Sequence, residues 1–120
     1  MSDCVFCEIV AGESPAQIVT ESMHSIEIVP LNPVVSGHTI VIPREHLTDA
    51  YDSAYGTGHT FRDASWFARL RAGHNPQYES VNLITSVGTP ATQSVFHLHV
   101  HIVPRQYGDG LQLPWGGNDA

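Results

Sequence analysis

The sequence predicts an α+β fold in which an antiparallel sheet of about five strands packs against one main helix, with a short helix at the N-terminus. Two observations lead to this prediction. Short apolar runs that alternate or end at Pro or Gly are typical of strands. One longer segment carries a capping pattern followed by apolar residues that can cover a sheet. At 120 residues, the chain is expected to form a single domain, with a core over 1–104 and a C-terminal tail over 105–120.

The two helices are expected from the signals at their ends. The first covers residues 3–11, with Ser2 or Asp3 as its N-cap and a glycine directly after it. The main helix is expected to begin near Thr60, because Thr60 and Asp63 have the spacing of a capping box, and to end at the next glycine.

Four strands can be placed by their apolar patterns and by the Pro and Gly residues around them. The first two flank a turn that contains two prolines, so we expect them to form a hairpin. The four strands cover residues 25–29, 37–42, 80–85 and 94–103.

Composition excludes several classes of partner. The net charge is −7, and the five basic residues are all arginines, which argues against binding a nucleic-acid backbone. No apolar stretch approaches the roughly 20 residues that span a bilayer. The first residues lack the basic and apolar regions of a signal peptide, so we expect a cytoplasmic protein with no membrane partner.

The segment 95–103 holds three histidines at strict two-residue spacing within an apolar alternation. In a strand, His97, His99 and His101 share one face. The alternate residues share the core face: Phe96, Leu98, Val100 and Ile102. Successive side chains on one face lie roughly 6.5–7 Å apart, so three histidines converge on one metal only if the strand bends sharply. The spacing therefore favours separate tasks for the three rings, the alternative being polar residues on a solvated sheet face.

A neutral imidazole is a competent nucleophile toward phosphorus near pH 7. His99 lies between the other two histidines, which makes it the natural reacting group. His101, one step along the same face, can donate a hydrogen bond to a phosphate oxygen or to the leaving group. The loop 86–93 before this segment is rich in small and hydroxyl side chains, which suits a phosphate but is also typical of an ordinary turn.

Residues 93–101 resemble the alternating motif of the histidine-triad (HIT) family, and three further segments match that family in the right order. These segments are 4–16, 32–43 and 82–84. The resemblance implies a nucleotide-binding homodimer whose sheet continues across the two copies. It also implies chemistry at the α-phosphate of a nucleotide, with a transient nucleotidyl group on His99 and the other ring nitrogen of His99 bonded to the backbone carbonyl of His97.

The resemblance also assigns binding roles. Phosphate contacts are implied for Gln93, Ser94 and His101, and a supporting role beside them for His38. The residues that match the apolar walls of the nucleoside pocket are Phe6, Ile9, Ile28 and Leu31. Two positions depart from the pattern: Pro30 stands where many relatives have an acidic or amide residue that holds the ribose, and Ser86 stands where an amide usually helps to hold the nucleotide.

Cys4 and Cys7 are three residues apart, so on a helix both thiols emerge on one side and can share a metal ion. A lone pair of this kind is also compatible with a redox pair or with two small buried hydrophobic residues. The zinc-containing relatives complete such a pair with two histidines. In this chain the resemblance implies the set Cys4, Cys7, His46 and His97, with a structural zinc ion.

These observations lead to one interpretation with two alternatives. The chain is interpreted as a hydrolase or nucleotidyl transferase that acts on a purine nucleotide or nucleoside phosphate derivative through His99, with His97 and His101 in the same site and no catalytic cofactor. The first alternative is a nucleotide-binding module with negligible turnover. The second is a metalloenzyme that holds an open catalytic metal with two triad histidines.

Overall fold

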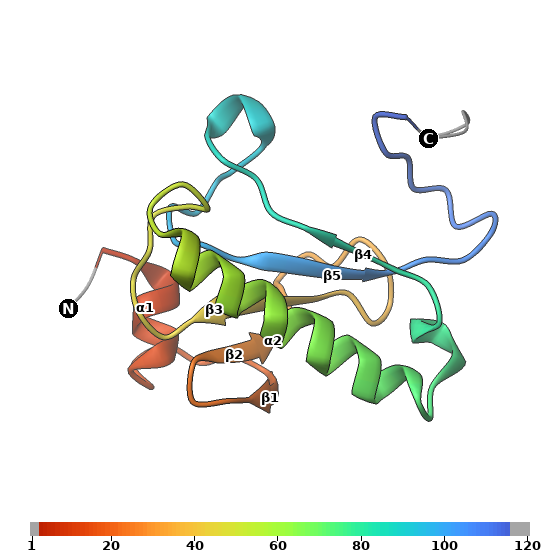
Figure 1. Cartoon of the computed structure of the whole chain (residues 1–120), viewed down its shortest axis with the longest axis horizontal. Helices are drawn as coiled ribbons and strands as arrows, with labels where there is room; N and C mark the ends of the chain where they lie inside the picture. Colours follow the sequence, from red (N-terminus) through yellow and green to blue (C-terminus); the bar gives the residue numbers. More distant parts are fainter. Residues whose placement is uncertain (1–2, 116–120) are drawn as a thin grey trace.

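The computed structural model describes residues 3–115. Within this range the chain forms one antiparallel sheet in the order β1-β2-β3-β5-β4, with a short helix α1 and a long helix α2 (Figure 1). The bounds are α1 Val5–Val10, β1 Ile18–Glu21, β2 Ser25–Ile28, β3 Thr39–Pro43, α2 Ala54–Ala72, β4 Val81–Ile84 and β5 Val100–Pro104. Two 3₁₀ turns lie at Pro76–Tyr78 and Thr89–Ala91. The predicted fold class is confirmed.

The two faces of the sheet carry separate apolar cores. Helix α2 covers one face, where Phe67 and its neighbours on the helix pack against Val41, Val100 and Ile102. On the other face, Phe6 of α1 packs against a row of isoleucines from β2 and β3, namely Ile26, Ile28, Ile40 and Ile42. Within residues 3–115, no helix combines the length and the apolar character that a membrane span needs. The α1 face is the one that carries the candidate site.

Buried polar contacts fix α2 on the sheet. Glu27 of β2 is fully buried and accepts hydrogen bonds from Arg71 and from the Thr39 hydroxyl, each at 2.5 Å. Asp63 of α2 accepts hydrogen bonds from the hydroxyls of Ser22 and Ser25. A buried carboxylate is costly unless it is paired, so these contacts specify where the helix lies.

The histidine segment differs from its prediction, because β5 begins at Val100 and not at residue 94. Before it, the Leu98 N–H donates to the Leu47 carbonyl at 2.6 Å, which takes the chain out of the sheet. Leu98, Val100 and Ile102 are buried as expected. Phe96 is 48% exposed, so its predicted place in the core is wrong. The alternation therefore predicts burial correctly from Leu98 onward and fails at Phe96, farther from the strand.

The helix starts also differ. Helix α2 begins at Ala54, with the Ser53 hydroxyl accepting from Gly56 N–H, and not near Thr60. Thr60 is buried within the helix and donates to the Gly56 carbonyl, so it is not a cap. Gly56 weakens the helical pattern but lets Leu47 pack closely, because a Cβ atom there would require the end of the Leu47 side chain to move.

Helix α1 begins at Val5, and its N-cap is Cys4, whose sulfur accepts from the Cys7 N–H. The predicted start at Asp3 is therefore two residues early, and Ser2 and residues 116–120 lie outside the described residues. The strand β1 was not located from the sequence, because it lies at an edge and three of its four residues are exposed.

Candidate functional site

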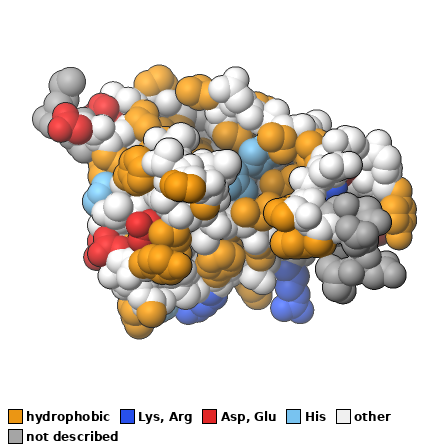
Figure 2. All heavy atoms as spheres, turned by 90° about the horizontal axis from the view of Figure 1, so that it is seen from above, with side chains coloured by type: hydrophobic (Ala, Val, Ile, Leu, Met, Phe, Trp, Pro, Cys, Tyr) orange, Lys and Arg blue, Asp and Glu red, His pale blue; other side chains and the backbone are white. Residues whose placement is uncertain are grey.

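A cavity of about 670 Å³ opens beside α1, between the end of β2, the turn that follows it and the histidine segment. Its volume lies in the range of small-molecule sites. Eight of the residues predicted for the site line it: Phe6, Ile9, Ile28, Leu31, His38, Ser94, His99 and His101. Figure 2 shows histidine atoms near the middle of one face of the molecule, between hydrophobic side chains.

The sheet register explains why these residues meet. Ile28 of β2 pairs with Ile40 of β3, and Ile40 pairs with His101 of β5. Directly paired residues point to the same face of a sheet, so the apolar wall and the histidine stand side by side. Phe6 of α1 covers this row and meets the His99 ring edge-on, with the ring centroids 5.2 Å apart.

The ring and the backbone of His99 are each fixed by a hydrogen bond. Its Nδ1 lies 2.8 Å from the carbonyl oxygen of His97, the contact that the resemblance implied. A carbonyl oxygen only accepts, so Nδ1 carries the proton and Nε2 keeps its lone pair. The Thr85 hydroxyl donates to the His99 carbonyl at 2.7 Å and fixes the backbone. Burial lowers the pKa of His99, so the ring is neutral at pH 7.

His38 and His101 form a chain of hydrogen bonds that begins at the backbone. The Val34 N–H donates to His38 Nδ1 at 3.0 Å, so the neutral His38 ring carries its proton on Nε2. That Nε2 lies 2.9 Å from His101 Nδ1, and it donates to it. The proton of His101 is therefore on its own Nε2. His101 is a hydrogen-bond donor, whereas His99 presents a lone pair.

Both rings of this chain stay neutral at pH 7. Burial lowers the pKa of His38. Burial, together with the charges of His99 and His38, lowers the pKa of His101 to about 4. The His99 and His101 rings have centroids 5.1 Å apart, so a nucleophilic nitrogen and a donor serve neighbouring positions in one cavity.

Gln93 does not line the cavity, contrary to the prediction. Its side chain is buried, donates to the carbonyls of Thr48 and Val95, and accepts from the Gly88 N–H. Both polar atoms of the Gln93 side chain are therefore engaged in holding the loop next to Ser94. Ser94 itself lines the cavity. Ser86, which stands where many relatives have an amide that helps to hold the nucleotide, also lies outside the lining.

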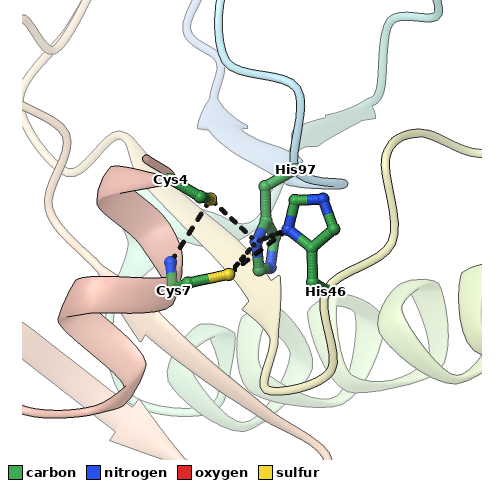
Figure 3. A group of neighbouring side chains, drawn as sticks. All are labelled: Cys4, Cys7, His46 and His97. Carbon is green, nitrogen blue, oxygen red and sulfur yellow. Dashed lines mark hydrogen bonds between the residues drawn. The ribbon is translucent and has the colours of Figure 1, made fainter. Parts of the chain in front are cut away.

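A second group of side chains lies on the far side of α1. Figure 3 shows Cys4 and Cys7 pointing from α1 toward His46 and His97. The ligand atoms of the four residues all lie within 4.8 Å of one another. His97 is fully buried, and its Nε2 donates to the Pro43 carbonyl at 2.9 Å, so its Nδ1 faces the group as a lone pair.

The distances within this group fit a tetrahedral zinc ion. The two histidine Nδ1 atoms are 3.2 Å apart, Cys4 Sγ is 3.3 Å from His97 Nδ1, and Cys7 Sγ is 3.2 Å from His46 Nδ1. Ligands at zinc–nitrogen and zinc–sulfur bond lengths of about 2.1 and 2.3 Å stand roughly 3.3–3.8 Å apart around a tetrahedron. Two sulfurs and two imidazoles form a closed donor set of the structural kind.

The three histidines of the triad belong to two different sites, the cavity and the group around Cys4. Within residues 3–115, the group around Cys4 is the one cluster of three or more possible metal ligands, and His97 is its one triad member. His99 and His101 face the cavity. Among the described residues, no group of three or more possible metal ligands includes two triad histidines. His97 serves the cavity through its carbonyl, and its ring lies outside the lining.

Several residues that shape the site were not found from the sequence. Thr85 holds the backbone carbonyl of His99, and the backbone groups of Val34 and Pro43 orient the rings of His38 and His97, each through a single hydrogen bond. Gln17 and Asn32 also line the cavity. The hydrogen bonds of Thr85 and Pro43 join residues 14 and 54 positions apart in the chain, and such contacts leave no pattern in the sequence.

Comparison with known proteins agrees with this geometry. The family model for the HIT domain matches residues 11–108 and leaves α1 with its two cysteines outside the match. The chain is 33% identical over 116 residues to the protein named Protein hit of Bacillus subtilis, covering 94% of this chain and 79% of that protein. It is also 34% identical over 113 residues to the protein named adenylylsulfatase HINT3 of Arabidopsis thaliana, covering 92% of this chain and 56% of that protein.

A solved structure with the same fold holds a metal. It is described as a Zn-bound histidine triad family protein from Mycobacterium smegmatis. The two folds superpose with a TM-score of 0.83 at 35% sequence identity, over 92% of this chain and 80% of that one.

Proposed function

Because this chain belongs to the HIT family, which is of the nucleotide-binding hydrolase and transferase kind, we propose that it cleaves or transfers a nucleotidyl group at the α-phosphate of a purine nucleotide derivative. The observation that carries the proposal is the orientation of His99. Its Nδ1 is occupied by the His97 carbonyl, so the lone pair on Nε2 is left for attack, in a ring whose pKa is lowered by burial.

The proposed reaction has two displacements. His99 Nε2 attacks the α-phosphorus, a P–N bond forms, and the bond to the leaving group breaks with its electron pair. The ring then carries a positive charge, which the His97 carbonyl stabilises through Nδ1–H. Water or another acceptor attacks the same phosphorus, the electron pair of the P–N bond returns to Nε2, and the proton of the acceptor is released to solvent. Two smaller barriers replace one large barrier.

His101 and Ser94 are assigned to the phosphate. His101 presents Nε2–H beside His99, so it can donate to a phosphoryl oxygen whose charge grows during attack, while Ser94 lines the same cavity. The nucleoside is assigned to the apolar part of the cavity, where Phe6, Ile9 and Ile28 form the wall and Leu31, 98% exposed, stands at the mouth.

A structural zinc ion is proposed for Cys4, Cys7, His46 and His97. When bound there, zinc would contribute folding free energy. Support comes from the donor set, from the distances within it and from the similar structure that is described as zinc-bound. The ligands come from α1, from the turn after β3 and from the segment before β5, so the ion would join three parts of the chain at the backbone that holds His99.

A homodimer is proposed as well, with the sheet continued across the two copies. The edge strand β4 pairs only with β5 among the described strands, so one of its sides is open to a second chain. Sedimentation should give twice the mass of one chain, and a monomer at micromolar concentration would contradict the dimer.

The experiment that tests the proposed function incubates the protein with adenosine 5′-phosphoramidate and measures intact mass after acid-free quenching. We expect an adenylylated chain and release of AMP. The His99→Ala variant should lose both, whereas His74→Ala, which changes an exposed histidine outside the cavity, should keep both. Binding of AMP without adduct or turnover would favour the nucleotide-binding module, and turnover by His99→Ala would exclude the proposed nucleophile.

A further inference from the structure

The lining of the cavity has a polar part around the histidines and a mostly apolar remainder. His38, His99, His101 and Ser94 supply the polar atoms suited to a phosphate. The rest of the lining is mostly hydrocarbon, and none of the lining residues is Asp, Glu, Lys or Arg. A nucleotide bound with its phosphate at the histidines must therefore place its sugar against a wall that has no charged group.

Pro30 is part of this wall. It follows the end of β2, lines the cavity beside Ile28 and Leu31, and is partly buried. A proline has no N–H group and an apolar ring, so its side chain and nitrogen offer no hydrogen bond to a hydroxyl. The sugar would meet carbon atoms at this position.

Two amides remain as polar side chains away from the histidines. Gln17 and Asn32 line the cavity, but both residues are exposed. A hydrogen bond from an exposed amide replaces one that water makes equally well, so it adds little discrimination. By contrast, a site built to bond a hydroxyl strongly rejects the analogue that lacks it, because buried polar groups are then left unpaired. Outside the histidine end, no polar side chain of the lining is buried.

We infer that this site does not read the 2′-hydroxyl of the sugar, and that its substrates include 2′-deoxyribonucleoside phosphate derivatives as well as ribonucleoside derivatives. This inference rests on the proposed function. The chemical step is the same in both cases, because His99 Nε2 attacks the α-phosphorus and the sugar takes no part. The sugar preference follows from the missing hydrogen-bond acceptor at position 30, which makes this a specificity-determining position.

The test compares kcat/KM for adenosine 5′-phosphoramidate and its 2′-deoxy analogue. The native chain should give a ratio within about threefold, the effect of one solvent-exchanged hydrogen bond. The Pro30→Asp variant, which adds a carboxylate acceptor to the wall, should raise the ratio in favour of the ribonucleotide by about tenfold or more. The Pro30→Ala control, which adds no acceptor, should keep the native ratio.

Calorimetric titration with AMP and dAMP separates this inference from the proposed function. If neither substrate is turned over but both monophosphates bind with similar Kd, the catalytic proposal fails and the inference about the sugar holds. A native preference for the ribo form above about threefold, in turnover or in Kd, would overturn the inference while leaving the enzyme in place. Absence of both binding and turnover would overturn both. The ratio of kcat/KM values measured with the native chain tests the inference even if the Pro30→Asp variant does not fold.

Discussion

Two substitutions of His38 separate its two hydrogen bonds. An asparagine places its side-chain oxygen near the position of Nδ1, so His38→Asn keeps the acceptor for the Val34 N–H and loses the donor to His101. A glutamine places its amide nitrogen near the position of Nε2, so His38→Gln keeps the donor and loses the acceptor. The pair therefore tests whether His38 acts on His101 or only supports the fold.

The magnitudes follow from the contacts. A neutral hydrogen bond contributes about 0.5–1.5 kcal/mol, so His38→Asn should lower kcat/KM by about 2- to 12-fold through loss of the bond that fixes the proton of His101. Its free energy of unfolding should change less than that of His38→Gln, which leaves the Val34 N–H without its partner at a cost of about 1 kcal/mol.

The assay combines steady-state kinetics with adenosine 5′-phosphoramidate and urea unfolding of the same preparations. Activity should follow the donor, and stability should follow the acceptor. If His38→Asn keeps full kcat/KM while His38→Gln loses it, the proposed direction of the hydrogen-bond chain from Val34 to His101 is wrong.

Three further predictions concern metal, packing and pH. Metal analysis should find one zinc ion per chain, lost in Cys7→Ser together with about 10 °C or more of Tm, and unchanged Tm after chelation would contradict a structural ion. Arg71→Met leaves Glu27 buried without its cation and should cost about 3–5 kcal/mol in urea unfolding, so a loss below about 1 kcal/mol would refute that role. The pKa of His101 is about 4 in the folded chain against an ordinary 6.5, so the folded state takes up this proton less readily. The free energy of unfolding should therefore fall as the pH drops from 6.5 toward 4, with a shallower fall in His101→Gln, and equal slopes would exclude His101 as the cause.

The sequence predicts those parts of the fold that depend on local spacing. Alternation correctly assigns Val100 and Ile102 to the core and His101 to the opposite face, because β5 is paired on both sides there. It fails at Phe96, because a hydrogen bond between Leu98 and Leu47, 51 residues apart in the chain, ends the ladder first. Such a contact is decided by the whole fold.

In the candidate site, too, some features could be predicted from local spacing and others depend on the whole fold. The spacing of Cys4 and Cys7 places two sulfurs together, but only the family resemblance pointed to His46 and His97 as their partners. The family resemblance implied a phosphate contact for Gln93, whereas its amide donates to the carbonyls of Thr48 and Val95 and accepts from the Gly88 N–H. Composition indicates what a side chain can bind, and the fold decides which partner it meets.

The most direct test of the proposed mechanism determines which histidine ring nitrogen becomes covalently bonded to phosphorus. Protein labelled with ¹⁵N at its histidine rings is treated with adenosine 5′-phosphoramidate, and ¹⁵N–³¹P coupling is measured on the trapped adduct. Coupling is expected to Nε2 of His99, because its Nδ1 is held by the His97 carbonyl. Coupling to Nδ1, or to a ring other than that of His99, would contradict the proposed mechanism.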